Sequence, residues 1–187
     1  MTSLRPPLTG CVAVLTPGEM LLLREHLLRL DPESRRQRFN GAISERFVER
    51  YITNYITDGT LVIGYIVDGE MRGVAELHPP DQPGSSPEIA FSVEKVFRSQ
   101  GVGSILFERV IHEARIKGYD NLKMTTDHNN EGMKALARKF GVRMEFRKGE
   151  STGILKLKQR VSPHQTVPST HLRMRAASSG ARIGYST

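Results

Sequence analysis

The stretch that decides the fold reads Arg98-Ser99-Gln100-Gly101-Val102-Gly103. It stands between residues 88–93, where large apolar side chains alternate, and an amphipathic segment that ends at Gly118. That order predicts a strand, a glycine loop and a helix. Glycines before a helix expose backbone N–H groups, and the positive end of the helix dipole attracts phosphate. We therefore interpret the stretch as a candidate anion-binding loop.

Two other kinds of phosphate loop are excluded by spacing. A dinucleotide fingerprint requires a third glycine where Leu106 stands, and no Lys-Ser/Thr pair completes a P-loop. Short glycine turns before helices are also common. The loop by itself therefore leaves anion binding and a plain turn open.

The rest of the chain supplies the elements of a mixed α/β domain. Capping signals and apolar spacing predict helices over about 16–30, 34–39, 44–55 and 130–140. Period-two runs predict strands over about 61–67, 71–77, 88–93, 119–126, 143–147 and 153–158. The first two strands are joined at Asp68-Gly69, a strong hairpin signal.

Length and composition are typical of one soluble domain. The 187 residues suit a single core, and 38% hydrophobic with 25% charged residues is ordinary globular usage. The N-terminus has no apolar segment of signal-peptide length, and no stretch is long enough to span a membrane. Cys11 is the sole cysteine, so neither an internal disulfide nor a cysteine-rich zinc site can form. We expect a cytoplasmic protein with no metal and no membrane partner.

The positive charge is concentrated at the C-terminus. Of the net charge of +7, more than half comes from residues 160–187, which contain four arginines and no carboxylate. The remaining excess is too small to identify a nucleic-acid surface, but it fits a polyanionic ligand or an acidic partner. We expect a domain over residues 1–159, a flexible basic tail over 160–187, and no nucleic-acid partner.

Two motifs resemble those of the GNAT superfamily of N-acetyltransferases. The glycine loop is similar to motif A, Arg/Gln-x-x-Gly-x-Gly/Ala, and residues 130–141 are similar to the superfamily's Asn-x-x-Ala/Met-x-x-Leu-Tyr/Ala-x-Lys-Leu-Gly segment. The order of expected elements over residues 10–158 also matches. The resemblance implies an α/β fold with a mostly antiparallel sheet of about six to seven strands, splayed between the fourth and fifth and flanked by about four helices. It also implies an acetyl-CoA-dependent N-acetyltransferase.

The same resemblance implies which residues would hold acetyl-CoA. Strand 88–93 would offer backbone groups to the pantetheine arm, and the glycine loop would offer N–H groups to the pyrophosphate. Asn130 would bond the pantetheine region or cap its helix. The expected contacts are Phe91, Ser92, Val93, Arg98, Ser99, Gln100, Gly101, Val102, Gly103, Ser104, Asn130 and Met133.

Acyl transfer requires an uncharged amine, so a general base is expected. Glu88 is the first candidate, because bacterial protein-lysine acetyltransferases of this superfamily carry a catalytic glutamate in a similar Glu-x-Ala-x-x-Val setting. Glu76, in the facing strand, is the second, and either carboxylate could instead be solvated or ion-paired. A strand N–H would stabilise the tetrahedral intermediate. The usual tyrosine acid is replaced by Ala137, which leaves either no dedicated acid or His128.

The acceptor is suggested by Leu30-Asp31-Pro32-Glu33-Ser34-Arg35-Arg36-Gln37-Arg38-Phe39. This segment resembles the Ser-Pro-Glu-Ser-Arg-x-x-Arg-Phe sequence of protein-lysine acetyltransferases that inactivate acyl-CoA synthetases. Its arginines could order an acidic partner surface or the CoA 3′-phosphate region, or form a solvated face. A small-molecule amine acetyltransferase and a non-catalytic CoA-binding module remain alternatives. A homodimer is also expected, because homodimers are common in the superfamily.

Overall fold

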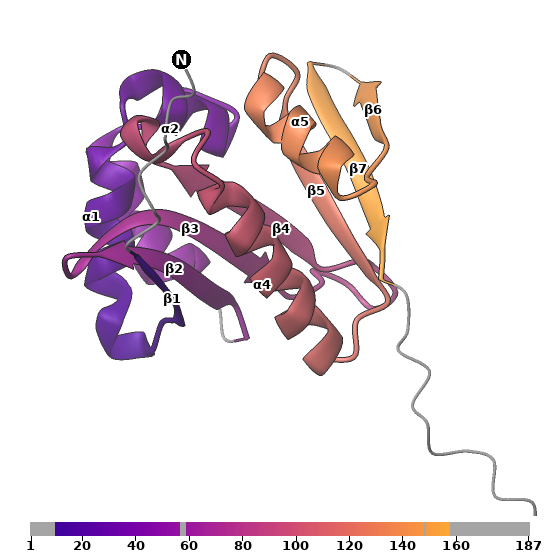
Figure 1. Ribbon diagram of the computed structural model, residues 1–187, viewed down its shortest axis with the longest axis horizontal. Coiled ribbons are helices and arrows are strands. Elements are labelled where there is room, and N and C mark those ends of the chain that lie inside the picture. The colour runs from indigo at the N-terminus through magenta and orange to yellow at the C-terminus, as the bar shows by residue number, and fades with distance from the viewer. Residues whose placement is uncertain (1–9, 57–58, 148, 158–187) are drawn as a thin grey trace, which may run out of the picture.

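The protein has a mixed α/β architecture built on one seven-stranded sheet, in the order β1-β2-β3-β4-β5-β7-β6 (Figure 1). The computed structural model describes residues 10–56, 59–147 and 149–157. The strands are β1 (Cys11–Val14), β2 (Leu61–Val67), β3 (Glu70–His78), β4 (Glu88–Val93), β5 (Asn121–Asp127), β6 (Met144–Arg147) and β7 (Glu150–Lys156). The α-helices are α1 (Met20–Arg29), α2 (Pro32–Phe39), α3 (Glu45–Arg50), α4 (Val102–Ile116) and α5 (Glu131–Lys139). Two short 3₁₀-helices, η1 (Pro17–Glu19) and η3 (Lys95–Phe97), and one π-helix, η2 (Tyr51–Tyr55), complete the set.

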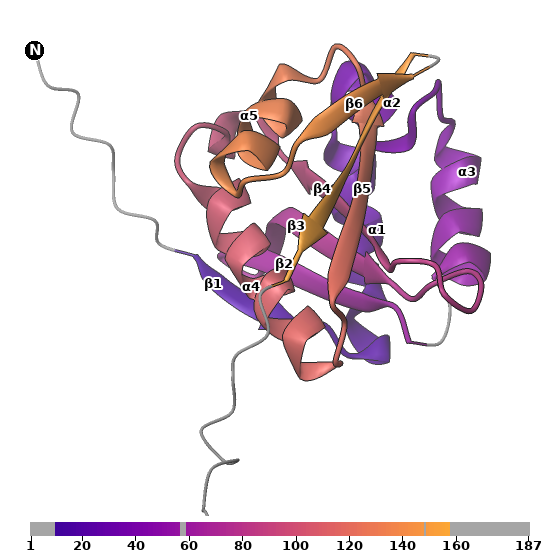
Figure 2. The ribbon, with the colours of Figure 1, turned by 90° about the vertical axis from the view of Figure 1, so that its right-hand side faces the viewer.

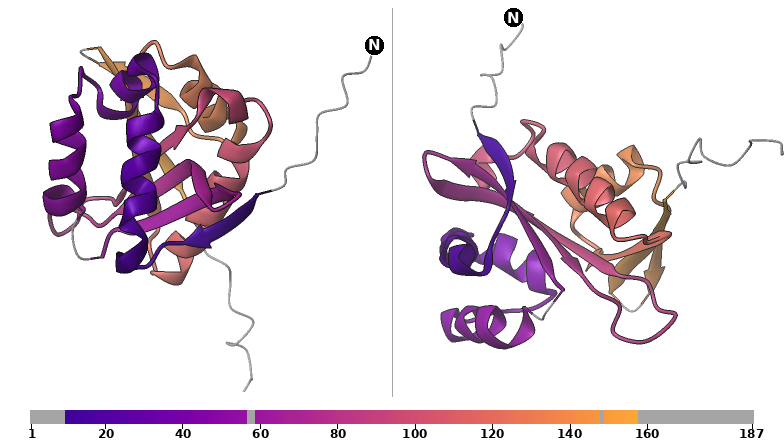
Figure 3. Two further views of the ribbon diagram at one scale, coloured as in Figure 1. Left: turned by 90° about the vertical axis from the view of Figure 1, so that its left-hand side faces the viewer. Right: turned by 90° about the horizontal axis from the view of Figure 1, so that it is seen from below.

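Helices cover both faces of the sheet. Helices α1 and α3 lie on one face, and α4 and α5 lie on the other (Figure 3). The core is accordingly divided into two clusters, one beneath α4 and one beneath α1 and α3. No helix in the described part of the chain is both long and apolar enough to cross a bilayer.

Helix α4 anchors the larger cluster through one apolar stripe. Val102, Leu106, Phe107, Val110 and Ala114 are all buried, at the i, i+4 and i, i+3 spacing that places side chains on one helical face. Phe107 stacks between Phe91 of β4 and Phe140, which directly follows α5, with ring centroids 5.2 Å and 4.2 Å away. This packing fixes the start of α4 beside the end of β4.

The sheet is splayed between β4 and β5. All other neighbours are antiparallel, whereas these two strands are parallel and pair only at Glu88↔Lys123 and Ile89↔Met124. Beyond these pairs the strands separate, and β5 continues with β7 and β6 as a second group of strands (Figure 2). The predicted mostly antiparallel sheet, including the position of the splay, is confirmed.

Several element bounds differ from the sequence-based expectation. The helix expected over 16–30 begins as a 3₁₀ turn, and the one expected over 44–55 becomes a π-helix at Tyr51. The described residues form five α-helices rather than about four. Strand β1 was not expected, because its four residues carry no turn signal and are specified by pairing with β2. The tail over 160–187 lies outside the described residues.

Glu94, directly after β4, joins α1 to the sheet. Its carboxylate lies 2.9 Å from Arg29 Nε, 3.1 Å from Arg72 Nη1 and 3.5 Å from His26 Nδ1. Burial raises the pKa of Glu94, but hydrogen bonds from His26, Arg29 and Arg72 outweigh it and hold the pKa at about 2. The ionised carboxylate therefore stabilises the fold.

Acid should destabilise the protein because it protonates the Glu94 carboxylate. Because the pKa is about 2 in the fold and 4.5 in an ordinary glutamate, the stabilisation is complete above pH 4.5 and is lost as the pH falls through the folded value. Glu94→Gln should flatten this part of the pH dependence of the unfolding free energy, measured by urea denaturation. Glu108→Gln, on the exposed face of α4, is the matched control. Equal acid slopes in all three proteins would contradict the prediction.

Candidate active site

A groove of about 570 Å³ lies where β4 and β5 separate. Its walls come from α2, the end of β4, the glycine loop, the start of α4 and the first turns of α5. The lining residues are Ser34, Gln37, Arg38, Phe91, Ser92, Val93, Arg98, Ser99, Gly101, Gly103, Ser104, Asn130, Glu131, Gly132, Met133, Ala135, Leu136 and Lys139. The two sequence motifs therefore meet in one cavity.

The glycine loop presents backbone N–H groups to this groove. Ser99 and Gly101 both have left-handed backbones, with φ of 57° and 98°, and Gly101 caps α4. Ser104 and Ile105 donate the first helical hydrogen bonds, both to Gly101 O, at 2.9 and 3.1 Å. The N–H groups of Gly101, Val102 and Gly103 thus precede the helical ladder and have no partner within it. Such a turn at a helix N-terminus is a concave anion site.

Small side chains keep the groove open between α4 and α5. A Cβ atom on Gly103 would lie 3.5 Å from Leu136 Cδ2, so a larger side chain would extend into the space beside α5. Lys139 Nζ donates to Ser104 Oγ at 2.7 Å across the same gap. A cation therefore stands beside the free N–H groups, as a polyanionic ligand requires.

Arg98 links three walls of the groove. Its Nε donates to Val93 O at 2.9 Å, and its Nη2 donates to Ser34 Oγ at 2.6 Å. Ser34 is itself held by Asp31, which caps α2. The first residue of the motif therefore positions the end of β4 and the start of α2, in addition to placing positive charge near the loop.

The edge of β4 offers backbone groups to the groove. In an antiparallel pair, alternate residues direct their N–H and C=O groups to the partner strand. Glu94 N donates to Arg72 O at 2.9 Å, so the even-numbered residues of β4 face β3, and Lys123 N donates to Pro87 O on the opposite side. The backbone groups of Phe91 and Val93 therefore point toward the space that β5 has left.

Most of the residues that were expected to hold acetyl-CoA line the groove, and two do not. Gln100 turns back to donate to Val96 O at 2.6 Å, and Val102 is buried in the core, so these two offer only backbone N–H groups. Asn130 lines the groove and also caps α5, accepting from Met133 N at 3.0 Å. The structure is thus compatible with Asn130 both as a helix cap and as a contact of the pantetheine region.

The arginines of residues 30–39 bond within the protein rather than forming a solvated face. Arg35 donates to Leu28 O at 2.7 Å, and Arg36 Nη1 donates to Asp127 at the end of β5 at 2.8 Å. Arg38 is buried and pairs with Glu76 of β3. Helix α2 is therefore held to strands on both sides of the splay. Its residues Ser34, Gln37 and Arg38 line the groove.

Glu88 lies at the closed end of the splay and is not among the residues that line the groove. Its side chain is 37% exposed, and its Oε2 is 3.2 Å from Lys123 Nζ. Cross-strand pairing puts it opposite His78 and on the face of the sheet that α2 covers. A carboxylate there is accessible to an amine that approaches from the α2 side.

Glu76 is in a different environment. Its carboxylate is fully buried, accepts from Arg38 Nη2 at 2.7 Å and from the Tyr51 hydroxyl, and lies 3.3 Å from His78 Nε2. Burial opposes ionisation, but the charge of Arg38 and the hydrogen bonds from His78 and Tyr51 lower the pKa of Glu76 far below its usual range. A buried, fully engaged carboxylate is not available to an amine, so this geometry does not favour Glu76 as the base.

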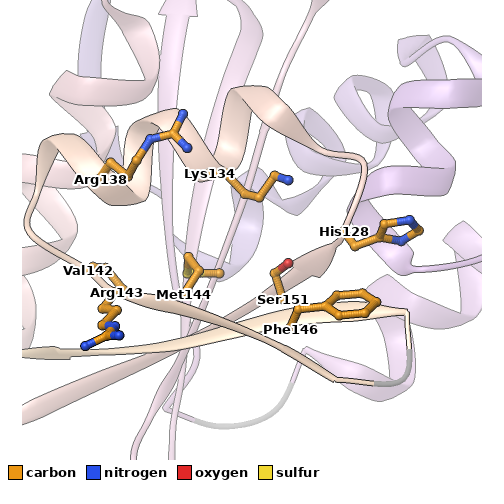
Figure 4. A pocket seen from close by; sticks show the side chains of 8 residues that line it. All are labelled: His128, Lys134, Arg138, Val142, Arg143, Met144, Phe146 and Ser151. Carbon is orange, nitrogen blue, oxygen red and sulfur yellow. The ribbon is translucent and has the colours of Figure 1, made fainter.

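His128 belongs to a second pocket, of about 530 Å³, between α5 and the β6–β7 hairpin (Figure 4). Its Nδ1 lies 3.1 Å from Gly149 O, and its ring packs near Phe146. The charged ends of Arg138 and Arg143 point in different directions around this pocket. His128 does not line the splay groove, and Ala137 is fully buried. Neither position supplies an acid there.

Comparison with known proteins identifies the fold. Residues 23–142 match the acetyltransferase (GNAT) family, and the chain belongs to that family. Members of the family are acyl-CoA-dependent N-acetyltransferases.

Solved structures share the fold at low sequence identity. The GNAT domain of S. lividans PAT is 21% identical, with a TM-score of 0.67 over 79% of this chain and 90% of that one. A ribosomal-protein-alanine N-acetyltransferase from Brucella melitensis is 19% identical, with a TM-score of 0.58 over 79% and 99%. A Salmonella typhimurium protein solved with its cofactor acetyl-CoA is 14% identical, with a TM-score of 0.61 over 84% and 99%.

Proposed function

We propose that this protein transfers an acetyl group from acetyl-CoA to a primary amine, and that the amine is a lysine side chain of another protein. The observation that carries the proposal is the groove at the β4–β5 splay, which joins an anion-binding loop to a free strand edge. Family membership supports acyl transfer, and the nature of the acceptor is inferred from the walls of the groove.

The groove suits acetyl-CoA as donor. The N–H groups before α4, with Lys139 and Arg98 beside them, match a pyrophosphate. The backbone N–H groups of Phe91 and Val93 and the carbonyl of Phe91, on the edge of β4 that β5 has left, match the amides of a pantetheine arm. The structural neighbour from Salmonella typhimurium was solved with acetyl-CoA, which supports the same donor here.

The reaction requires the acceptor to lose a proton before it attacks. An alkylammonium is protonated at neutral pH, so a base must remove one proton to free the nitrogen lone pair. We assign this role to Glu88, acting directly or through one water molecule. The strand edge at Phe91 and Val93 supplies an N–H that can stabilise the oxyanion of the tetrahedral intermediate.

Helix α2 supports a protein lysine as the acceptor. Residues 30–39 resemble a segment of lysine acetyltransferases that act on acyl-CoA synthetases, and α2 lines the groove and is held there by two ion pairs across the sheet. An acyl-CoA synthetase is therefore the acceptor class we favour. A small-molecule amine is the alternative.

The test is acetyl-CoA turnover, measured as release of free thiol, with purified acyl-CoA synthetases and a panel of small amines. Acetylation of a synthetase lysine, mapped by mass spectrometry, is the expected result. Turnover with small amines alone would overturn the acceptor assignment. Acetyl-CoA binding without any turnover would indicate a non-catalytic CoA-binding module, and absence of binding would reject the donor assignment.

Glu88→Gln should lower kcat by about 100-fold or more at neutral pH, because general-base catalysis contributes about 10²–10⁴-fold. Acetyl-CoA affinity should stay within about twofold of the wild type, since Glu88 lies outside the groove lining. Glu108→Gln is the control for charge. An unchanged rate over the whole pH range would remove Glu88 from the mechanism.

A further inference from the structure

His78 is a polar side chain next to the proposed base that the sequence did not single out. It ends β3 directly opposite Glu88 of β4, so the two side chains emerge on the same face of the sheet. That face is the one covered by α2, which lines the groove. The His78 side chain is 23% exposed, in contrast to the fully buried Glu76 two residues earlier.

The buried side chains behind His78 determine which of its ring nitrogens carries the hydrogen. Nε2 lies 3.3 Å from Glu76 Oε2 and 3.4 Å from the Tyr51 hydroxyl oxygen. Glu76 remains ionised beside Arg38, and an ionised carboxylate can only accept hydrogen bonds. Nε2 must therefore carry a hydrogen and donate it, which leaves the lone pair of a neutral ring on Nδ1. Nδ1 has no hydrogen-bond partner among the described residues.

The charges around His78 come from four elements. Glu76 lies on β3, Arg38 on α2, Glu88 on β4 and Lys123 on β5, with Tyr51 of η2 as a neutral neighbour. Arg38 is matched by Glu76, and Lys123 is matched by Glu88. A proton added to Nδ1 therefore places one positive charge next to two ion pairs that each carry no net charge.

We propose that His78 is a further residue of the proton path, which takes on Nδ1 the proton that Glu88 removes from the acceptor amine. This inference rests on the proposed amine acetylation. A carboxylate binds a cation well but holds an added proton poorly at neutral pH, whereas an imidazole can hold either state. Glu88 therefore removes the proton from the amine, and His78 holds it afterwards.

The proton balance is complete with the groups at hand. The ammonium gives one proton to Glu88, which passes it to His78 Nδ1, and the freed lone pair forms the C–N bond at the thioester carbon. The C–S bond then breaks with its electron pair on sulfur, and the second nitrogen proton passes to the thiolate. The products are an N-acetylated amine and CoA thiol, and His78 returns its proton to water.

His78→Gln is the informative variant, because an amide can still donate to Glu76 but cannot take up a proton. We expect kcat to fall about 10- to 100-fold at neutral pH and to recover as the pH rises and the free amine becomes abundant. The KM for acetyl-CoA should be unchanged. His112→Gln, an exposed histidine on α4, is the control and should behave as the wild type. A loss that is constant across pH would indicate a merely structural role and would overturn the proposal.

A second test separates shared from independent roles. If His78 and Glu88 act on the same proton, the double variant His78→Gln/Glu88→Gln should lose little more than the more damaging single variant. Multiplying losses would overturn the shared role. This comparison uses only ratios of kcat and is unaffected by the choice of acceptor.

Should His78→Gln fail to fold, imidazole ¹⁵N spectra of the wild-type protein still test the geometry. Assigned His78 signals should show the Nε2–H tautomer, and the Nδ1–H tautomer would overturn the proposal. Failure of the proposed function is distinguished by the wild-type enzyme, which would then acetylate no amine. Wild-type turnover with an unaffected His78→Gln variant would reject only the role of His78.

Discussion

Gly101→Ala should weaken acetyl-CoA binding by about 100-fold while the protein remains folded. The residue has φ of 98°, a conformation that an alanine adopts only under strain, so the loop should relax and turn its N–H groups away from the ligand. Hydrogen bonds to a charged group contribute about 1.5–3 kcal/mol each, and about 2.7 kcal/mol corresponds to 100-fold. Isothermal titration calorimetry with acetyl-CoA measures the change directly.

Gly118→Ala is the matched control for backbone strain. Gly118 follows the other end of α4, has φ of 76°, and has nothing within 4 Å of an added Cβ. Both alanines should lower the free energy of unfolding by a similar amount, about 1–2 kcal/mol. Only the change at Gly101 should affect binding. Equal binding losses in the two variants, or none in either, would contradict the assignment of the loop.

Arg38→Met should lower the free energy of unfolding by about 3–5 kcal/mol, the usual cost of leaving a buried charge unpaired. Glu76 is fully buried, and Arg38 is the cation that keeps it ionised. Without that cation, burial should drive the pKa of Glu76 upward, so the variant should be less destabilised in acid than at neutral pH. Urea denaturation at both pH values measures this.

The double variant Arg38→Met/Glu76→Gln tests whether the cost arises from the pair. A neutral amide at position 76 removes the unpaired charge and can still accept from the Tyr51 hydroxyl. We expect the double variant to recover at least about 1 kcal/mol relative to Arg38→Met, as coupled neighbours do. Additive losses would indicate that Arg38 stabilises the fold through packing alone.

The glycine loop, the strand before it and the cap of α5, which all border the groove, could be predicted because their signals are local. The glycine loop, the alternating strand before it and the cap at Asn130 each depend on neighbours within a few residues, so the sequence alone specifies them. The splay followed from the family resemblance, and the pairing of β4 with β5 confirms it. Ser92 and Met133, which the resemblance implied as cofactor contacts, both line the groove.

The contacts between α2 and β3 could be predicted less well, because they join segments that are distant in the sequence. Arg38 and Glu76 are 38 residues apart, and nothing local distinguishes a buried arginine from a solvated one. Glu76 was therefore weighed as a base although it is an ion-pair partner. His78 did leave a signal, since residues i and i+2 of a strand share a face, which groups it with Glu76. The spacing points to a shared site only when the register of β4, which pairs His78 with Glu88, is also known.

The separation of β4 and β5 gives one sheet four edges instead of two. The outer edges, β1 and β6, are only four residues long, and β6 carries alternate charges, so both discourage pairing with other chains. The inner edge at Phe91 and Val93 is shielded by helices but keeps backbone amides free. Amide hydrogens there should exchange rapidly in an otherwise protected strand, and should slow when a ligand with amides of its own docks as a substitute strand.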